Sequence, residues 1–477
     1  MKVLLVVHNF LPNHAAGTEV YTLQLGQELA RRGHDVIVFA AEKDISLADL
    51  SVREREYGGL RVVELINNLH YADLRETWEQ PRITAIFESW LERLAPDVVH
   101  FQHLWYLSVG CIEACAARYV PVIFTLHDYW LQCARYGQRV HADSSICHTI
   151  EFRRCGECLT SFKFAQSSTE RGLARWIARV RGTTGLNFGP AARGAARLAQ
   201  GWKDGRGGPS AGDAERAARR ADVLTERVAE RDHTFRERIV PNVYRFLSPS
   251  HFLLRRFVEW GIPEERIQFL RTGIDLSRFG KVERTRSEKV RVAFLGTLAP
   301  HKAPHLLLEA WQRLAPELAA KAELVLYGPF QHNHEYVAEL QRLAGLVGAR
   351  LAGSLARNDV PRALCSTDLL VVPSVWWENS PLVIVEGIAT RTPMLVSDLG
   401  GMAELVQPGH SGYHFKVGDV EDLARKLAEL IGDRSKLDAL YREVEPIKSV
   451  ARDAEQIEEI YFEAIDALRA ARLTERP

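Results

Sequence analysis

The sequence predicts an α/β protein made of two doubly wound parallel sheets that face a common cleft. Two observations predict this class. Apolar segments typical of buried strands alternate with amphipathic helical segments, and the alternation occurs twice, before and after a polar stretch at residues 275–289. The length of 477 residues also favours more than one domain. Ligands of such folds bind at the carboxyl ends of the strands, so the functional site is expected in the cleft.

The first series opens with a βαβ unit. Residues 3–7 are a continuous apolar run, typical of a strand that is covered on both faces of its sheet. Apolar residues recur at helical spacing over residues 18–32, Gly33 stops this helix, and residues 36–40 form the next strand. The other elements expected in this domain are strands at 98–101, 122–126 and 246–247 and helices at 109–118 and 249–260.

The second series follows the polar stretch. Its expected strands are residues 290–295, 322–327, 369–372 and 394–397, and its expected helices are residues 305–314, 335–346, 382–389, 420–431 and 451–472. We therefore place an N-terminal domain at residues 1–285 and a C-terminal domain at residues 286–445. Residues 446–477 form a helix that can pack back on the N-terminal domain. Residues 133–240 fit neither series and are interpreted as an insert in the first domain.

Charge is balanced over the whole chain and uneven within it. The 61 Lys and Arg residues match 61 Asp and Glu residues, which argues against a nucleic-acid binder. Residues 151–250 hold 19 basic and 11 acidic side chains, which indicates an anionic surface or substrate, or else a solvated face. One helical face within this insert either lies on a membrane or packs on the domain; it carries Leu173, Trp176, Ile177 and Val180.

The sequence indicates a cytoplasmic location. No segment approaches the roughly 20 apolar residues of a membrane-spanning helix. The apolar run at the start is short, and no small-residue cleavage site follows it. If the helix of the basic insert binds lipid, the protein is expected to be peripheral at the inner face of the cell membrane.

The strongest chemical signal is a pair of carboxylates, Glu378 and Glu386, separated by seven residues. They lie where a strand ends and the next helix starts, and Ser380-Pro381 suits the beginning of that helix. The free N–H groups near Ser380, Leu382 and Val383, together with the helix dipole, favour a bound anion. Because two Glu residues occur at this spacing in helices by chance, the spacing alone is a weak signal. The position of the pair directly after a strand makes it a strong one.

Residues 373–386 resemble the E-x7-E motif of glycosyltransferase family 4, the group 1 enzymes. Residues 392–404 are similar to the next strand and Gly-Gly turn of that family, and residues 409–413 and 417–419 match as well. The resemblance implies the GT-B fold, in which two Rossmann-like domains face a cleft. It also implies a retaining enzyme whose C-terminal domain binds a nucleotide sugar and whose N-terminal domain receives the acceptor.

The resemblance also implies roles for individual residues. Gly296 and Lys302 resemble a segment in which Arg and Lys clamp the donor diphosphate, but Thr297 stands where the family has Arg. Glu378 would hold sugar hydroxyls or a developing positive charge, and Glu386 would bind the ribose. The implied catalytic residues are His127, Lys302 and Glu378. The implied donor-binding residues are Gly17, Thr18, Gly296, Thr297, Lys302, Asn379, Ser380, Pro381, Leu382 and Glu386.

Three of these residues lie in the first domain. The segment at residues 15–21 resembles the Gly-rich loop of the family, in which small residues let the backbone approach the donor phosphate; Gly17 and Thr18 belong to it. The segment at residues 125–130 resembles the family's histidine site, where the imidazole of His127 would face the reacting sugar. A single histidine is more often structural, and the position at a strand end favours the functional interpretation.

Four cysteines cluster in the insert, namely Cys133, Cys147, Cys155 and Cys158. A tetrahedral zinc ion takes four thiolates, and a C-x2-C hairpin at Cys155 and Cys158 would supply two of them. The spacing is not that of two C-x2-C knuckles. The alternative is four reduced thiols that pack independently. A structural zinc ion is thus one of two interpretations, and a catalytic zinc ion is not indicated.

We therefore predict a retaining glycosyltransferase that moves a sugar from a UDP-, GDP- or similar nucleotide donor to an acceptor. The acceptor would be a glycan or a polyprenyl-diphosphate-linked sugar, in cell-surface polysaccharide or glycoconjugate synthesis. No catalytic cofactor is required, because a lysine and backbone N–H groups can neutralise the phosphates. Two alternatives remain: a nucleotide-sugar epimerase, which needs no acceptor, and a degenerate GT-B binding protein, which Thr297 suggests.

Overall fold

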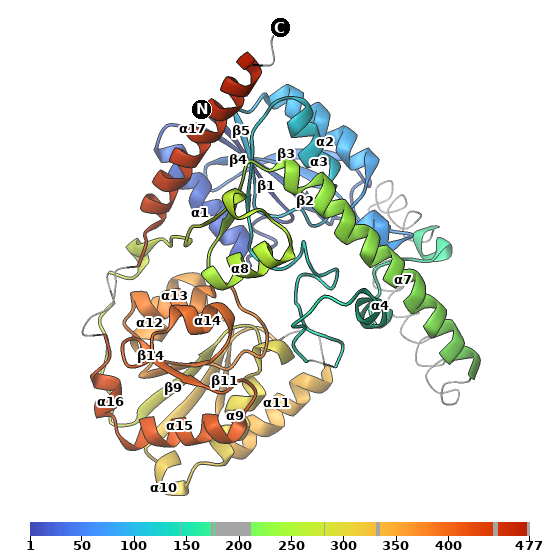
Figure 1. Cartoon of the computed structure of the whole chain (residues 1–477). Coiled ribbons are helices and arrows are strands. Elements are labelled where there is room, and N and C mark those ends of the chain that lie inside the picture. Colours follow the sequence, from blue (N-terminus) through green and yellow to red (C-terminus); the bar gives the residue numbers. More distant parts are fainter. Residues whose placement is uncertain are drawn as a thin grey trace.

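The computed structural model describes residues 1–143, 145–172, 176, 211–280, 282–330, 334–441 and 447–474. Within these ranges the chain forms two α/β units, each built around a sheet of mainly parallel strands. The two units lie one above the other in Figure 1. This arrangement confirms the predicted fold class of two doubly wound domains.

The first sheet has eight strands in the order β3-β4-β2-β1-β5-β6-β7-β8. All neighbours pair in parallel except β3 and β4, which form an antiparallel edge. Its strands are β1 (Lys2–Val7), β2 (Asp35–Glu42), β3 (Val52–Tyr57), β4 (Leu60–Ile66), β5 (Val98–Phe101), β6 (Val122–Thr125), β7 (Arg245–Ser248) and β8 (Ile267–Phe269). Strands β3, β4 and β8 were not predicted from the sequence.

Helices cover both faces of this sheet. They are α1 (Gly17–Arg31), α2 (Pro81–Leu94), α3 (Gly110–Ala117), α4 (Phe152–Thr160), α7 (Ala211–Arg238) and α8 (His251–Trp260). Helix α8 begins two residues after the predicted start, because the side chain of Ser250 caps it by accepting from the N–H of Leu253. The side chains of β1 alternate between two apolar clusters, one on each face of the sheet, so the strand is buried as predicted.

The described part of the insert is a pair of packed helices, α4 and α7. Figure 1 shows one end of α7 against the first domain and the other end extending away from it. Cys155 and Cys158 lie within α4, so the predicted C-x2-C hairpin is wrong. The reason is tertiary packing: Gly156 lets α4 approach α7 so closely that a side chain there would overlap Thr225. Of the predicted amphipathic face, Leu173, Ile177 and Val180 lie outside the described residues.

The second sheet has six strands, all parallel, in the order β11-β10-β9-β12-β13-β14. Its strands are β9 (Val290–Leu295), β10 (Ala322–Tyr327), β11 (Arg350–Gly353), β12 (Leu369–Val372), β13 (Met394–Ser397) and β14 (Gly412–Phe415). Its helices are α9 (Pro304–Gln312), α10 (Pro316–Ala319), α11 (His334–Val347), α12 (Val360–Cys365), α13 (Leu382–Ala389), α14 (Gly400–Leu405), α15 (Val420–Gly432) and α16 (Ser435–Asp438).

The last helix, α17 (Val450–Thr474), returns to the first domain. Its apolar face joins the core formed by α1 and β1. Two buried polar contacts accompany this packing. Tyr21 donates to Asp453 across 2.9 Å, and Tyr461 lies 2.6 Å from a ring nitrogen of His100. The chain therefore crosses between the domains twice. In the described residues, no helix is long and apolar enough to cross a membrane.

Candidate active site

A lysine and a glutamate meet at the carboxyl edge of the second sheet. Lys302 ends a short 3-10 helix (Pro300–Lys302) after β9, and Glu378 lies in the loop between β12 and α13. The Lys302 Nζ atom is 2.5 Å from Glu378 Oε1, and the Ser374 hydroxyl donates to the same oxygen across 3.0 Å. The strand order places β9 beside β12, which explains why residues 76 positions apart come together.

The Glu378 carboxylate stays ionised although it is 6% exposed. Burial by itself would raise its pKa. The Lys302 ammonium and the hydrogen bond from Ser374 help to outweigh burial, and the pKa of Glu378 lies below its ordinary value. The ammonium of Lys302 also lies 5.0 Å from the centre of the Trp376 ring. Near neutral pH the site therefore holds a charged pair.

The loop that carries Glu378 rests on the Gly400-Gly401 turn. The N–H of Gly401 donates to the Glu378 carbonyl across 2.8 Å. A side chain at Gly401 would overlap the carbonyl oxygen of Asn379, and Gly400 has a φ of +57°. The predicted Gly-Gly turn thus has a physical role, because two bare glycines let the backbone of one loop support the next.

The amino end of α13 points into the same region. The helix begins at Leu382, and Pro381 is its N-cap rather than part of its first turn. The first-turn amides of Leu382 and Val383 have no acceptor within the helix. Beside them, Asn379 Oδ1 and Ser380 Oγ are buried and have no hydrogen-bond partner among the described residues. Buried polar groups are normally satisfied, so this cluster indicates the place of a ligand.

The first domain closes over this end of α13. The Asn379 side-chain amide donates to the His127 carbonyl across 2.7 Å. A side chain at Gly17 would lie 3.7 Å from Leu382 Cδ1, so the Gly-rich loop faces the start of α13. Gly17 and Thr18 form the first turn of α1. The predicted residues of the two domains thus meet at the start of α13.

A group of histidines at the carboxyl edge of the first sheet was not predicted. His8 follows β1 and His103 follows β5. The His8 ring is 3.3 Å from Glu19, and the His103 ring is 3.2 Å from Asp128. His8 Nδ1 and Glu19 Oε2 are buried without a partner in the described structure. Their positions directly after strands were the signal that could have identified them.

His127 lies beside this group. Its Nε2 atom is 2.8 Å from Gln102 Oε1, and its ring meets the edge of Tyr21 at a centroid distance of 5.4 Å. Burial, and then the neighbouring His103, lower the pKa of His127 to about 3. The imidazole is therefore neutral near pH 7 and can exchange hydrogen bonds with a substrate without carrying charge.

These imidazoles predict an acid-sensitive fold. Burial lowers the pKa of both His100 and His127 to about 3, whereas the unperturbed value is 6.5. Between those values the unfolded chain binds more protons, so the free energy of unfolding falls as the pH drops. The expected slope is about 1.4 kcal/mol per pH unit for each imidazole.

Urea unfolding from pH 7 to pH 4.5 measures this slope. His100→Gln should reduce the slope and the exposed-site control His251→Gln should not, and equal slopes in all three proteins would contradict the assignment.

Glu386, the second carboxylate of the motif, faces the interdomain linker. Its Oε1 atom is 3.3 Å from an Nη atom of Arg278, in the 3-10 helix Leu276–Arg278. Burial raises the pKa of Glu386, and Arg278 and Arg357 partly oppose this effect. Neither arginine was predicted, because each lies in a single 3-10 turn without a recognisable motif.

Gly296 and Thr297 lie where β9 ends. Gly296 has a φ of +158° and lies so close to Gly328 that a side chain at Gly328 would overlap the Gly296 carbonyl. Thr297 is exposed and brings no charge to the position where the family usually has Arg. Lys302 is thus the cation that the predicted diphosphate site receives from this segment.

The four cysteines of the insert line one narrow cavity together with Arg135 and Arg139. Burial raises the pKa of the Cys155 thiol to about 12, and the neighbouring thiols add to this rise. In the described part of the chain, no group of three or more His, Cys, Asp and Glu residues is arranged to hold a metal ion. The four thiols share one cavity, and a structural zinc ion at them stays a prediction.

Solved structures with the same architecture cover nearly the whole chain. The Anabaena protein HepE in complex with UDP and glucose aligns with a TM-score of 0.56 and 16% identity, over 99% of both chains. Sucrose-phosphate synthase from Thermosynechococcus elongatus aligns with a TM-score of 0.57 and 16% identity, over 100% of this chain and 98% of that one. At this identity the likeness establishes the fold, which is the GT-B fold of two Rossmann-like domains.

Family models match both domains. A model for group 1 glycosyl transferases matches residues 278–445, and a model for glycosyltransferase family 4 matches residues 15–162. Together they cover about two thirds of the chain. The chain belongs to the family 4, group 1 glycosyltransferases, and the predicted family is confirmed.

Curated relatives match over shorter regions. A D-inositol 3-phosphate glycosyltransferase of Nocardia farcinica is 29% identical over 216 residues, which is 42% of this chain and 48% of the relative. WcaL of Escherichia coli K12, whose name assigns it to colanic acid biosynthesis, is 27% identical over 208 residues, 42% of this chain and 48% of the relative. The chain spans about half the length of these relatives.

Proposed function

We propose that the chain is a retaining glycosyltransferase that moves a sugar from a nucleotide-diphosphate donor to a glycan or a polyprenyl-diphosphate-linked acceptor. One observation carries this proposal. The Lys302–Glu378 pair and the start of α13, which the loop at Gly17 approaches, flank Asn379 and Ser380, whose side-chain oxygens are buried and unsatisfied in the described structure. Cationic and N–H groups line one side, which suits a diphosphate.

Charge development explains how these groups would act. Breaking the bond between sugar and phosphate leaves extra negative charge on the departing diphosphate. The Lys302 ammonium and the amides of Leu382 and Val383 are fixed in place before the reaction and would stabilise that charge. A departing diphosphate would take over part of the interaction that Lys302 now makes with Glu378. The ionised Glu378 would then be free to bind sugar hydroxyls or the developing positive charge.

Other residues would position the donor. The carboxylate of Glu386, which Arg278 contacts, would accept hydrogen bonds from ribose hydroxyls. The neutral ring of His127 and its carbonyl, which Asn379 contacts, would face the transferred sugar. A reaction on one face of the sugar needs no protein nucleophile and retains the configuration. Because lysine and amides neutralise the phosphates, the chemistry requires no metal ion.

The names of relatives and structural neighbours support the substrate classes. HepE was solved with UDP, with UDP-glucose, and with UDP and glucose, which favours a nucleotide-sugar donor here. WcaL is named for colanic acid biosynthesis, which favours cell-surface polysaccharide as the product class. A cytoplasmic location, peripheral at the membrane, would fit such a product.

A degenerate binding protein is the second candidate, and the exposed Thr297 is the observation that favours it. Release of nucleotide separates the two. UDP- and GDP-sugars are incubated with the protein, with and without a panel of neutral and lipid-linked glycan acceptors. We expect release that depends on an acceptor. Binding of the nucleotide sugar without any release would support the binding protein, and a changed donor sugar without an acceptor would support an epimerase.

A further inference from the structure

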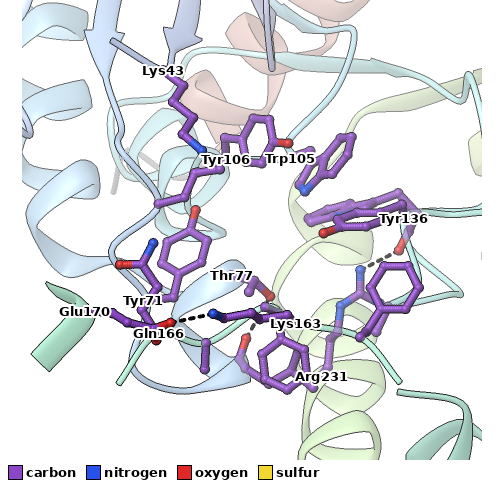
Figure 2. Close-up of a pocket in the computed structure, with 17 residues that line it drawn as sticks. Lys43, Tyr71, Thr77, Trp105, Tyr106, Tyr136, Lys163, Gln166, Glu170 and Arg231 are labelled. Carbon is purple, nitrogen blue, oxygen red and sulfur yellow. Dashed lines mark hydrogen bonds and ion pairs between the residues drawn. The ribbon is translucent and has the colours of Figure 1, made fainter. Parts of the chain in front are cut away.

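A second cavity of about 460 Å³ lies in the first domain, on the insert side of the histidine group. Its size falls in the range of small-molecule sites, roughly 300–1,000 Å³. Figure 2 shows Lys43, Tyr71, Trp105, Tyr106 and Tyr136 around it. None of the residues predicted from the sequence lines it. The lining comes from the ends of strands and from the insert, which is the part of the chain that fitted neither series.

Aromatic rings form the walls of this cavity. Trp105 stacks on Tyr106 with ring centres 4.4 Å apart and lies 4.7 Å from Tyr136, whose ring is 4.9 Å from that of Phe162. Tyr136 is 37% exposed although it lies in this cluster. Flat aromatic faces beside an open space suit the apolar face of a sugar ring, while the hydroxyls of the tyrosines can bind its polar edge.

The base of the cavity holds a buried cation without an anionic partner. Arg231, on α7, lines the cavity and is 3% exposed. Its guanidinium donates only to the backbone carbonyls of Trp130 and Leu131, and no carboxylate pairs with it among the described residues. Buried charges are normally paired, because an isolated charge is costly to desolvate. The Trp130 and Phe235 rings, whose centres lie 4.8 Å and 4.2 Å from the guanidinium carbon, stabilise this charge but do not neutralise it. A guanidinium on a cavity wall without a carboxylate partner therefore points to an anionic ligand.

Two lysines add positive charge at the rim. Lys43 follows β2, and Lys163 lies in the insert, where it pairs with Glu170 across 2.5 Å. In Figure 2 the Lys43 side chain runs toward Tyr106, and the Lys163 side chain runs toward Glu170, with their ion pair drawn as a dashed line. The Glu170 carboxylate cancels one of the two rim charges. Arg231 and Lys43 are therefore the cations left to meet an acidic group.

The cavity adjoins the histidine group of the cleft. The Trp105 ring stacks on His8 at 5.4 Å, and the Trp130 ring lies 5.5 Å from His103. A ligand in the cavity would therefore have one end next to His8 and His103. His8 also contacts Glu19, in the first turn of α1, which begins at Gly17.

We propose that this cavity binds the acceptor, and that the acceptor is an anionic carbohydrate. Its sugar ring lies on the Trp105 and Tyr136 faces, and its acidic group, a carboxylate, phosphate or diphosphate, lies at Arg231 and Lys43. The reacting hydroxyl then lies beside His8 and His103. This inference rests on the proposed function for its use, but the binding site itself is defined by the cavity alone.

Binding to the full-length protein in the presence of UDP tests the proposal. The probes are N-acetylglucosamine, glucuronic acid, N-acetylglucosamine 1-phosphate and farnesyl-diphosphate-linked N-acetylglucosamine, measured by calorimetry or saturation-transfer NMR. At least one acidic probe should bind about tenfold or more tightly than the neutral sugar, because a hydrogen bond to a charged group contributes about 1.5–3 kcal/mol. The acidic probe that binds most tightly shows whether the acidic group of the ligand is a carboxylate, a phosphate or a diphosphate.

Variants assign the preference to the cavity. Arg231→Gln should remove the preference for the acidic probe, whereas Arg227→Gln, one turn earlier on α7 and paired with Asp73, should keep it. Trp105→Leu should weaken binding of every probe. This variant tests whether the probes bind in the cavity even if Arg231→Gln does not fold. Equal affinity for neutral and acidic probes, or unchanged affinity in these variants, overturns the proposal. The affinity for UDP should stay the same in all of these variants. If the parent protein did not bind UDP at all, that result would instead count against the proposed function.

Discussion

Lys302→Ala is expected to lower kcat about 10²–10³-fold, the effect of removing one preorganised donor from a site of developing negative charge. The Nζ atom of Lys302 is 2.5 Å from Glu378, which lies three residues before Pro381, the N-cap of α13. The ammonium would stabilise the diphosphate more strongly as the bond to the sugar breaks. The loss should therefore appear in kcat more than in KM. Steady-state kinetics with the best donor and acceptor measure both constants.

Stability has to be separated from catalysis in this variant. Removing the lysine leaves Glu378 buried without its cation, so Lys302→Ala should be less stable by up to about 3 kcal/mol. Adding Glu378→Gln removes the buried charge, so the double variant should recover stability and remain inactive. The control Lys436→Ala removes a lysine that pairs with Glu429 outside the cleft, and it should change neither quantity. Lys302→Ala with a kcat within threefold of the parent would contradict the role of Lys302.

Gly401→Ala is expected to lower kcat/KM about 10²-fold while the protein still folds. The added methyl group would overlap the Asn379 carbonyl oxygen, and the N–H of Gly401 now holds the Glu378 carbonyl. The loop between β12 and α13 must shift to relieve the overlap. A displacement of about 1 Å at a reacting group can cost 10² in rate. Kinetics and a thermal unfolding curve on the same sample measure the effect.

Gly345→Ala is the matched control for this variant. Gly345 lies in α11, and a side chain there would meet no atom within 4 Å. Alanine is a better helix former than glycine, so this control should be equally active and up to about 1 kcal/mol more stable. If Gly401→Ala matched the control in activity, the Gly-Gly turn would have no part in positioning Glu378 and Asn379.

The alternation of apolar strands and helices was readable from the sequence because a buried parallel strand has no polar face. The run at β1 and the strands β9, β12 and β13 were predicted at nearly their observed bounds. The edge strand β3 was missed because its residues alternate between partly exposed and exposed positions, and Arg53 and Arg55 bind Glu64 on its neighbour β4. A polar edge strand resembles a loop when it is read without its partner.

The insert was the hardest part to predict. Helix α7 buries Leu224, Val228, Arg231 and Phe235 at helical spacing, but an arginine in the middle interrupts the apolar pattern. Helix α4 forms because Gly156 packs on α7, a contact more than 60 residues away in the sequence. Residues that depend on such distant contacts, Arg231 above all, become visible only in the folded chain.

The residues of the candidate site were likewise predictable only in part from the sequence. Glu378, Ser380 and Gly17 belong to contiguous segments with a recognisable pattern, and the structure brings them to one cleft. His8 and His103 were not predicted because each is a single polar residue after a strand. Their relation to Glu19 and Asp128 depends on which strands are neighbours in the sheet.

A crystal structure of the protein with UDP or GDP, whichever binds more tightly, tests the central claim most directly. The claim predicts the β-phosphate within hydrogen-bond distance of both Lys302 Nζ and the amides at residues 380–383, with the ribose at Glu386. A diphosphate bound elsewhere, or a Lys302 ammonium that shares no ligand atom with those amides, would contradict it.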